Sequence, residues 1–363
     1  MKKKTIILIV IIVTSIVSIF IWSLAMPSRL VYFGGSSSVN PFMQIATKKF
    51  GEEYKHSDEI IYNSNGSQNG VKSVENGTYS AGMISKEVKQ NTLSSGSDFS
   101  NIQGFDNEFE DTKTFNDFRN EVNKTKGINA MEFAIDAIVI MYNPPKWFIE
   151  NPEIANSINF DFNKDDHKKI VKKIYSNPNY MWADFVKELN PEIKDFNHGN
   201  ELLMPVSRES GSGTRSAFDD FFEIEDIDSG TANSNGSMIT QLRDTKGSFG
   251  YVSYGFYKNS ENNNLQTPWF NNKRLSKDEF IEVLNDDGTI QPGESKNEEH
   301  IKSDAGYELK RPFIMLFDSE NKKTNSVLEF VEFLITEKAN SAYEEEGLVR
   351  KVQYHKYDLI PND

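Results

Sequence analysis

Residues 206–218 (VSRESGSGTRSAF) hold the side chains best suited to chemistry in this chain. Arg208 stands four residues before the Ser-Gly-Thr run at 212–214, and an apolar helical pattern follows at once. The N-terminus of a helix presents unpaired N–H groups and the positive end of the helix dipole. Hydroxyls, bare amides and a guanidinium would therefore converge at one helix start, which suits a tetrahedral oxyanion.

Two further loops repeat this arrangement of small hydroxyl residues before a helix. Residues 34–41 (GGSSSVNP) and 65–70 (NGSQNG) each follow a short apolar run and precede apolar residues at helical spacing. Serines in such loops are expected to act both as N-caps and as donors to a ligand. One loop of this kind is weak evidence for a site, but three in one chain, one of them with an arginine, predict an anion pocket.

Alternating strands and helices are the frame that must bring these loops together. Strand–loop–helix units are expected at 30–50 and 60–76, a further short strand at 81–85, and another at 202–206 that leads into the arginine segment. This alternation predicts α/β layers with parallel strands. Ligands of such sheets lie at the carboxyl ends of the strands, where the three loops are.

A long buried strand is expected at 132–142 (EFAIDAIVIMY), and it carries one carboxylate, Asp136, inside its apolar run. An unpaired buried carboxylate is costly, so Asp136 is expected to have a partner or a raised pKa. A structural ion pair and a place in the anion site are both open for this residue.

The rest of the chain is expected to contain two polar insertions and the last strands and helix of the fold. Residues 88–128 and 258–310 are polar and loop-rich and are expected to be surface insertions, the first with Phe115 and Phe118 docking one short helix. Strands are expected around Lys273 and at 311–316, and a single amphipathic helix at 326–343, ended by Gly347.

The N-terminus predicts where the protein is located. Lysines at 2–4 precede an uncharged apolar run at 5–26, which is long enough to span a bilayer. Lysines on the N-terminal side place that end in the cytoplasm and the remainder outside the cytoplasm. A cleaved signal peptide is the alternative, with residues 23–25 (SLA) as a poor cleavage site. The length of the apolar run favours an uncleaved single-pass anchor.

Composition excludes several classes of function. The chain has 363 residues, 37% of them hydrophobic, which is enough for two domains with real cores. It has no cysteine, so disulfides, thiol nucleophiles and cysteine metal sites are impossible, and its five histidines lack zinc-site spacing. The net charge of −14 argues against a nucleic-acid partner and means that an anion must be recognised locally. No metal site, cofactor or catalytic motif is expected, and no histidine lies near the serines to act as a base.

The motifs together resemble those of the phosphate-binding protein family, the substrate-binding subunits of phosphate ABC transporters. The segments that carry the resemblance are 35–41 (GSSSVNP), 65–72 (NGSQNGVK), 133–140 (FAIDAIVI), 180–184 (YMWAD), 207–214 (SRESGSGT), 250–253 (GYVS) and 330–349. They follow one another in the family's order from about residue 32 to 349. Each loop alone would be unspecific, but the three together are specific.

The resemblance implies a two-lobed α/β fold of the type II periplasmic-binding-protein-like class, with a hinge, preceded here by one transmembrane helix. The implied organisation is 1–28 tip and anchor, 29–138 first part of lobe 1, 139–256 lobe 2, and 257–363 insertion and return to lobe 1. The implied phosphate-binding residues are Ser37, Ser38, Ser67, Asp136, Arg208, Ser212, Gly213 and Thr214, with Ser36 and Ser85 as possible additions. Some family members have an aspartate where Ser85 stands, and others have one where Asp136 stands, so Asp136 is expected to be the acidic acceptor for the proton of phosphate.

The function implied is a membrane-tethered extracellular receptor that captures inorganic phosphate between two lobes and delivers it to the permease of an ABC importer. Two other classes stay open. A surface phosphate-ester hydrolase would reuse the same oxyanion cradle, and it would show activity on a phosphomonoester with divalent ions. A surface adhesin would reuse the fold, and its activity would survive loss of Arg208.

Overall fold

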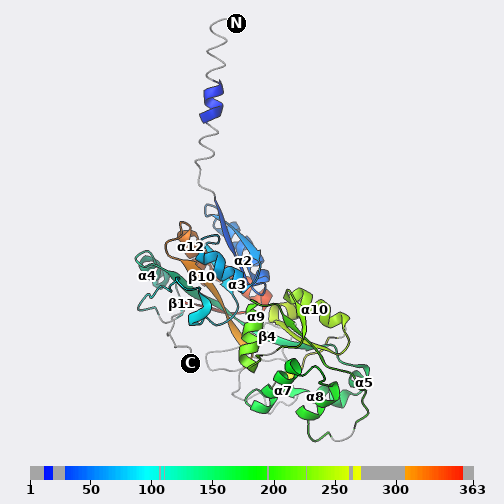
Figure 1. The fold of residues 1–363 in the computed structure, drawn as a ribbon. Coiled ribbons are helices and arrows are strands. Elements are labelled where there is room, and N and C mark those ends of the chain that lie inside the picture. The colour runs from blue at the N-terminus through cyan, green and yellow to red at the C-terminus, as the bar shows by residue number, and fades with distance from the viewer. Residues whose placement is uncertain are drawn as a thin grey trace.

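Strand β4 (Ile128–Tyr142) is long enough to pair with strands in both halves of the molecule. Its residues 128–137 pair antiparallel with β10 (Lys310–Asp318), and residues 138–142 pair antiparallel with β8 (Ser248–Ser253). Helices cover the sheets on either side of this strand, and Figure 1 shows two lobes joined through it. The mixed α/β, two-lobed architecture that the sequence predicts is therefore present.

This computed structural model describes residues 12–18, 29–105, 108–109, 111–193, 196–225, 227–260, 265–270 and 307–354. The strand expected around Lys273 lies outside these ranges. Of the apolar run expected to span a membrane, residues 12–18 form a short helix and the rest lies outside the described residues. No helix within the described ranges combines the length and apolarity that a membrane crossing requires.

Lobe 1 is built on the strand order β2-β1-β3-β10-β4, with β11 also pairing with β4. The first three strands are parallel to one another, and β10 runs antiparallel to β3. Besides β4 and β10, its elements are β1 (Leu30–Gly35), α2 (Asn40–Glu53), β2 (Glu59–Ser64), α3 (Ser67–Glu75), β3 (Ala81–Ile84), a 3-10 turn (Gln90–Thr92), α4 (Thr112–Val122), α12 (Thr324–Ile335), a second 3-10 turn (Glu337–Ala339), α13 (Asn340–Glu346) and β11 (Val349–Tyr354).

Lobe 2 continues the sheet in the order β4-β8-β6-β7, with β6 parallel to both of its neighbours. A small separate sheet pairs β5 with β9. The other elements of lobe 2 are α5 (Lys146–Ile149), α6 (Pro152–Ser157), β5 (Asn159–Phe160), α7 (Asp165–Ser176), α8 (Trp182–Leu189), β6 (Met204–Arg208), α9 (Gly213–Phe222), β7 (Gly230–Ala232), α10 (Asn235–Asp244), α11 (Tyr254–Lys258) and β9 (Trp269–Phe270).

Each lobe has its own hydrophobic core. Buried residues of lobe 1 come from 31–134 and 313–354, whereas those of lobe 2 come from 137–309. The chain thus passes between the cores from 134 to 137 and again from 309 to 313. Beside these passages the Ile138 amide donates to the Leu309 carbonyl at 2.9 Å. These two passages lie side by side in one antiparallel pair of strands.

Two predictions about lobe 1 have different outcomes. Phe115 and Phe118 are fully buried on helix α4, as expected for a short docked helix within the polar insertion. The prediction of one helix over 326–343 is wrong, because Thr336 adopts an extended conformation (φ −78°, ψ 158°) that ends α12 before α13 begins. Gly347 does end the second helix, with the positive φ of 65° that favours glycine at this position.

Helix α11 of lobe 2 packs against the end of α13 of lobe 1. The Lys258 ammonium donates to the Glu344 carbonyl at 2.7 Å, and Asn259 Nδ2 donates to the Glu346 carboxylate at 3.5 Å. Glu346 is buried beside Gly255, where a Cβ atom would collide with its carboxylate. Burial raises the pKa of Glu346 to about 7; Lys258 opposes this rise, and the charges of Asp136 and Glu345 add to it.

This buried carboxyl group predicts a pH dependence of stability. The unfolded chain loses the Glu346 proton near the usual value of 4.5, whereas the folded chain keeps it until about pH 7. The folded state binds more protons in between, so the unfolding free energy should fall as pH rises from about 4.5 to about 7. Glu346→Gln should remove roughly 2 kcal/mol of this fall. Urea denaturation at several pH values checks it, and parallel curves for wild type and variant would contradict it.

Candidate functional site

The loops at the carboxyl ends of β1, β3 and β6 meet where the two lobes face each other. Gly35 ends β1 with a φ of +128°, and a Cβ atom there would overlap the Met83 carbonyl of β3. The next residue, Ser36, donates its amide to that same carbonyl at 2.8 Å. Glycine is therefore required at 35 for the serine loop to turn closely over the end of the neighbouring strand.

Three buried serines of lobe 1 form one hydroxyl cluster. Ser36 Oγ donates to Ser85 Oγ at 2.8 Å, and Ser67 Oγ accepts from the Ser85 amide at 3.3 Å. The expectation that these serines cap helices is wrong, because the N-cap residues of α2 and α3 are Val39 and Gly66 and neither gives a side-chain cap. The hydroxyls are thus directed to one another across the loops.

Helix α9 of lobe 2 begins against this cluster. Ser212 is its N-cap, and its hydroxyl accepts from the Arg215 amide at 3.3 Å, as the sequence predicts. A Cβ atom on Gly213 would overlap the hydroxyl oxygens of Ser67 and Ser85. The positive end of the α9 dipole therefore lies directly on the hydroxyls of lobe 1.

Further hydrogen bonds join the lobes at the same place. Ser38 Oγ lies 2.9 Å from Thr214 Oγ1 and accepts from Asn235 Nδ2 at 2.9 Å. The Gln68 amide donates to the Gly211 carbonyl at 3.2 Å. Ser38, Thr214 and Asn235 are all buried, so the structure shows the two lobes in a closed arrangement.

Arg208 brings a guanidinium from β6 into this interface while it is only 1% exposed. Its Nη2 donates to Ser37 Oγ at 3.2 Å, across the lobes. Nε and Nη2 also donate to the two carboxylate oxygens of Glu209, each at 3.0 Å. Among the described residues, Nη1 has no hydrogen-bond acceptor although it is buried. A buried, unsatisfied N–H of a cation is costly, so this atom points to an acceptor from a ligand.

Asp136 does have the partner that burial requires. Arg311 of β10 pairs directly with it in the strand register, and Arg311 Nη2 lies 2.8 Å from Asp136 Oδ2. That oxygen also accepts from the Ser253 hydroxyl at 2.8 Å, while Oδ1 accepts from the Tyr254 amide at 3.3 Å. Burial raises the pKa of Asp136, and the charge of Arg311 opposes the rise.

Arg311 connects this ion pair to the hydroxyl cluster. Its Nη2 donates to Ser38 Oγ at 3.0 Å and its Nη1 to the carbonyl and hydroxyl oxygens of Ser85 at 3.1 and 3.3 Å. The closed interface thus contains two buried guanidinium groups, Arg208 and Arg311. Burial lowers the pKa of Arg311; Asp136 opposes this fall, and the positive charge of Arg208 adds to it.

The structure places every predicted site residue in this one region, but sequence reasoning missed three others. Arg311 directly precedes the apolar run 312–317, much as Asp136 lies inside the apolar run 133–140. A charged residue at a strand that is expected to be buried is the sequence feature that could have identified Arg311. Glu209 follows Arg208 directly in the sequence, but adjacency alone does not predict that its carboxylate binds the guanidinium. Asn235 begins helix α10, and nothing in its local sequence distinguishes it from a surface amide.

Comparisons with known proteins give the family. A model of the PBP superfamily domain matches residues 27–338. A solved structure from Clostridium perfringens, described as a phosphate ABC transporter substrate-binding protein with bound phosphate, is 19% identical, with 88% of this chain and 99% of that chain covered and a TM-score of 0.56. An ABC-type phosphate transport receptor from Vibrio cholerae is 18% identical, with 88% and 99% covered and a TM-score of 0.54. No curated protein matches the sequence. The family match covers most of the chain and agrees with the two-lobed fold, and the chain therefore belongs to the PBP superfamily.

Proposed function

We propose that this protein is an extracytoplasmic receptor that captures inorganic phosphate between its lobes and delivers it to the permease of an ABC importer. The buried, unsatisfied Nη1 of Arg208 carries the proposal, because it is a fixed donor in an interface of hydroxyls and a helix N-terminus. The solved structures from Clostridium perfringens and Vibrio cholerae are a phosphate ABC transporter substrate-binding protein with bound phosphate and a phosphate transport receptor, which supports phosphate as the ligand.

The groups proposed to hold the anion come from both lobes. Lobe 1 supplies Ser37, Ser38 and Ser67, with Ser36 and Ser85 beside them, and lobe 2 supplies Arg208 and the start of α9 from Ser212 to Thr214. Asp136 is the proposed acceptor for the phosphate proton. Its Oδ1 accepts one hydrogen bond, from the Tyr254 amide, and a carboxylate oxygen can accept a second. Closure would then stabilise the bound anion through contacts that neither lobe makes alone.

The location follows from the same proposal. The N-terminal run at 5–26 would be an uncleaved anchor that leaves the lobes outside the cytoplasm, where a receptor of an importer meets its ligand. We propose a type II arrangement in which residues 29–138 and the C-terminal part form lobe 1, with the hinge at the two chain passages between the cores. The strand order β2-β1-β3-β10-β4 supports this arrangement.

Titration calorimetry with phosphate, sulfate and arsenate tests the function. The expected result is tight, one-to-one binding of phosphate and arsenate and much weaker binding of sulfate, because fully deprotonated sulfate cannot donate to Asp136. Absence of phosphate binding by the folded protein would refute the proposal. If sulfate binds as tightly as phosphate, the anion site is supported, but Asp136 does not determine the preference for phosphate.

Gly213→Ala is expected to weaken phosphate binding at least tenfold with little change in thermal stability. The added methyl group would meet Ser67 and Ser85 across the interface and hold the lobes apart, while neither core is touched. Gly236→Ala is the matched control, since Gly236 also lies in the first turn of a lobe 2 helix and its nearest neighbour would be 3.8 Å away. Calorimetry and thermal melts of both variants check it. Equal phosphate affinities of Gly213→Ala and Gly236→Ala would contradict the proposal that the closed arrangement is the one that binds phosphate.

A further inference from the structure

The folded part of lobe 1 begins very close to the proposed membrane anchor. Arg29 is already fixed, because its Nη2 donates to the Ser57 carbonyl at 2.9 Å and its own carbonyl accepts from the Glu59 amide at 2.7 Å. The apolar run ends at Met26, three residues earlier. Three extended residues span at most about 11 Å. Whatever surface surrounds Arg29 must therefore lie within reach of lipid headgroups.

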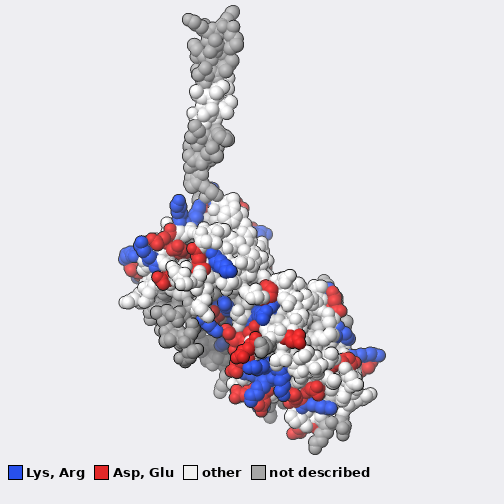
Figure 2. All heavy atoms as spheres, viewed as in Figure 1, with Lys and Arg blue, Asp and Glu red and all other residues white. Residues whose placement is uncertain are grey.

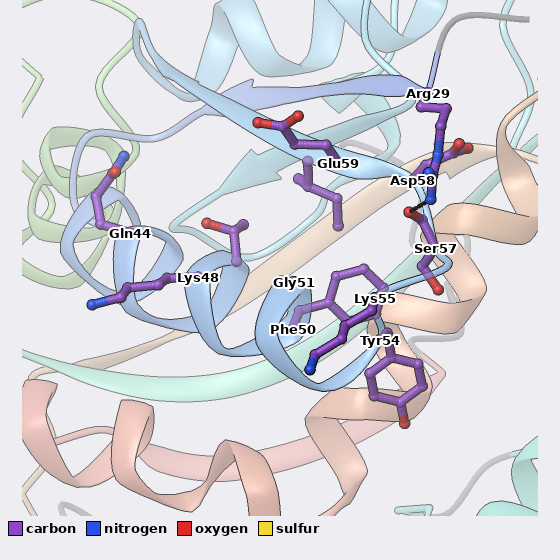
Figure 3. A pocket seen from close by; sticks show the side chains of 12 residues that line it. Arg29, Gln44, Lys48, Phe50, Gly51, Tyr54, Lys55, Ser57, Asp58 and Glu59 are labelled. Atoms are coloured by element: carbon purple, nitrogen blue, oxygen red, sulfur yellow. Dashed lines mark hydrogen bonds between the residues drawn. The ribbon is translucent and has the colours of Figure 1, made fainter.

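A groove opens beside Arg29, between helix α2 and the start of the edge strand β2. It has a volume of about 650 Å³, and we call it the α2 groove. Gln44, Lys48 and Lys55 line it from the helix and the turn that follows, and Arg29, Ser57, Asp58 and Glu59 line it from the strand side (Figure 3). Gln44 and Lys48 are four residues apart on α2, so one face of the helix presents them together, and Lys55 lies in the turn just beyond the end of α2 at Glu53.

The charge of the α2 groove is opposite to that of the chain as a whole. Asp58 is neutralised by Lys323, at 2.9 Å, and also accepts from the Ser326 hydroxyl at 2.7 Å. In the described part of the chain, neither Lys48 nor Lys55 forms an ion pair. Three cations, Arg29, Lys48 and Lys55, therefore face one uncompensated carboxylate, Glu59, in a protein of net charge −14. Figure 2 also shows Lys and Arg side chains at the end of lobe 1 where β1 begins.

We propose that the α2 groove binds the headgroups of anionic phospholipids, so that lobe 1 rests on the membrane surface along helix α2. The inference rests on the anchor in the proposed function. Cations within a Debye length of an anionic bilayer are attracted to it, whereas the acidic remainder of the chain is repelled. The two effects together would hold lobe 1 against the bilayer and leave lobe 2 free to move.

The absence of cysteine makes the test direct, because Gln44→Cys gives the full chain a single site for a fluorophore. The labelled protein is placed in lipid nanodiscs of phosphatidylcholine alone or with phosphatidylglycerol, each with a headgroup-linked quencher. We expect several-fold stronger quenching with phosphatidylglycerol and its loss in high salt. Ser176→Cys, at the end of α7 in lobe 2, is the control position and should show little quenching in either lipid.

Charge reversal distinguishes lipid binding by the α2 groove from a general effect of the protein's net charge. Lys48→Glu with Lys55→Glu should lower the quenching at position 44, because each reversed charge should weaken the affinity of the groove for the anionic lipid by at least about fivefold. Lys169→Glu with Lys173→Glu on α7 makes the same change in net charge and should not lower it. Equal quenching in both lipids, an unchanged signal after reversal, or failure of the full chain to enter nanodiscs would overturn the inference. Phosphate calorimetry on these variants should be unchanged, which distinguishes this failure from failure of the proposed function.

Discussion

Replacing Arg208 by alanine is expected to weaken phosphate binding about 100-fold, the effect of losing one hydrogen-bonded charge. The variant removes the unsatisfied Nη1 and the bond from Nη2 to Ser37, so the bound anion loses its charged donor from lobe 2. Arg208→Lys should recover only part of the affinity, because an ammonium group lacks the planar fork. Titration calorimetry measures both, and a wild-type dissociation constant in Arg208→Ala would remove Arg208 from the site.

Glu209 supplies the matched control for this charge. Its carboxylate binds Nε and Nη2 of Arg208 and is itself partly exposed, with 27% of the side chain accessible. Glu209→Gln keeps the shape and removes the negative charge beside the site, so it should bind phosphate as tightly as wild type or more tightly. A loss as large as that of Arg208→Ala would mean that Glu209 positions the guanidinium more than it neutralises it.

Breaking the buried pair of Asp136 and Arg311 is expected to lower the unfolding free energy by about 3–5 kcal/mol. Asp136→Asn keeps the size of the side chain but leaves the Arg311 guanidinium, which is 2% exposed, without its counter-ion. Replacing both residues, with Asp136→Leu and Arg311→Met, should restore most of the stability, because burying two charges is itself costly. Urea denaturation measures each variant.

The exposed pair of Lys89 and Asp220 is the control for that experiment. The Lys89 ammonium and the Asp220 carboxylate are 2.6 Å apart and join the lobes, and both side chains are 54% exposed. Asp220→Asn should change the unfolding free energy by less than about 1 kcal/mol. A small effect of Asp136→Asn, comparable to that of the control, would contradict the structural importance of the buried pair. In the same variant, unchanged affinity and unchanged preference for phosphate over sulfate would remove Asp136 from the anion site.

The sequence predicted those parts of the fold that depend on local patterns. Glycine and serine loops before helices identified the segments around Ser37, Ser67 and Ser212, because turn chemistry and helix starts are encoded over a few residues. Asp136 was recognised as a buried charge because it interrupts an apolar run. The prediction that one helix covers 326–343 failed because nothing in the apolar spacing reveals the extended conformation at Thr336.

Partners distant in sequence could not be predicted in the same way. Arg311 and Asp136 are 175 residues apart, and Asn235 and Ser38 are 197 apart, so only the folded sheet and the closure of the lobes bring them together. Glu209 shows a different limit, since it is adjacent to Arg208 in the sequence and is still not predicted as its partner. Whether a neighbouring carboxylate binds a guanidinium or points to solvent depends on side-chain geometry that the sequence does not specify.

The position of the ion pair has a mechanical consequence. Asp136 and Arg311 lie opposite each other in the strand register, within the two segments where the chain passes between the cores. The proposed ligand contacts therefore lie near the axis about which lobe 2 would turn, whereas α5 and α8 lie at the far end of lobe 2, away from that axis (Figure 1). In such an arrangement the ligand contacts are much closer to the turning axis than α5 and α8 are, so a given rotation moves these helices much further. A shift of a fraction of an ångström in how the anion fits would be magnified into a large swing at the distal tip, which is the displacement a transporter would be able to sense.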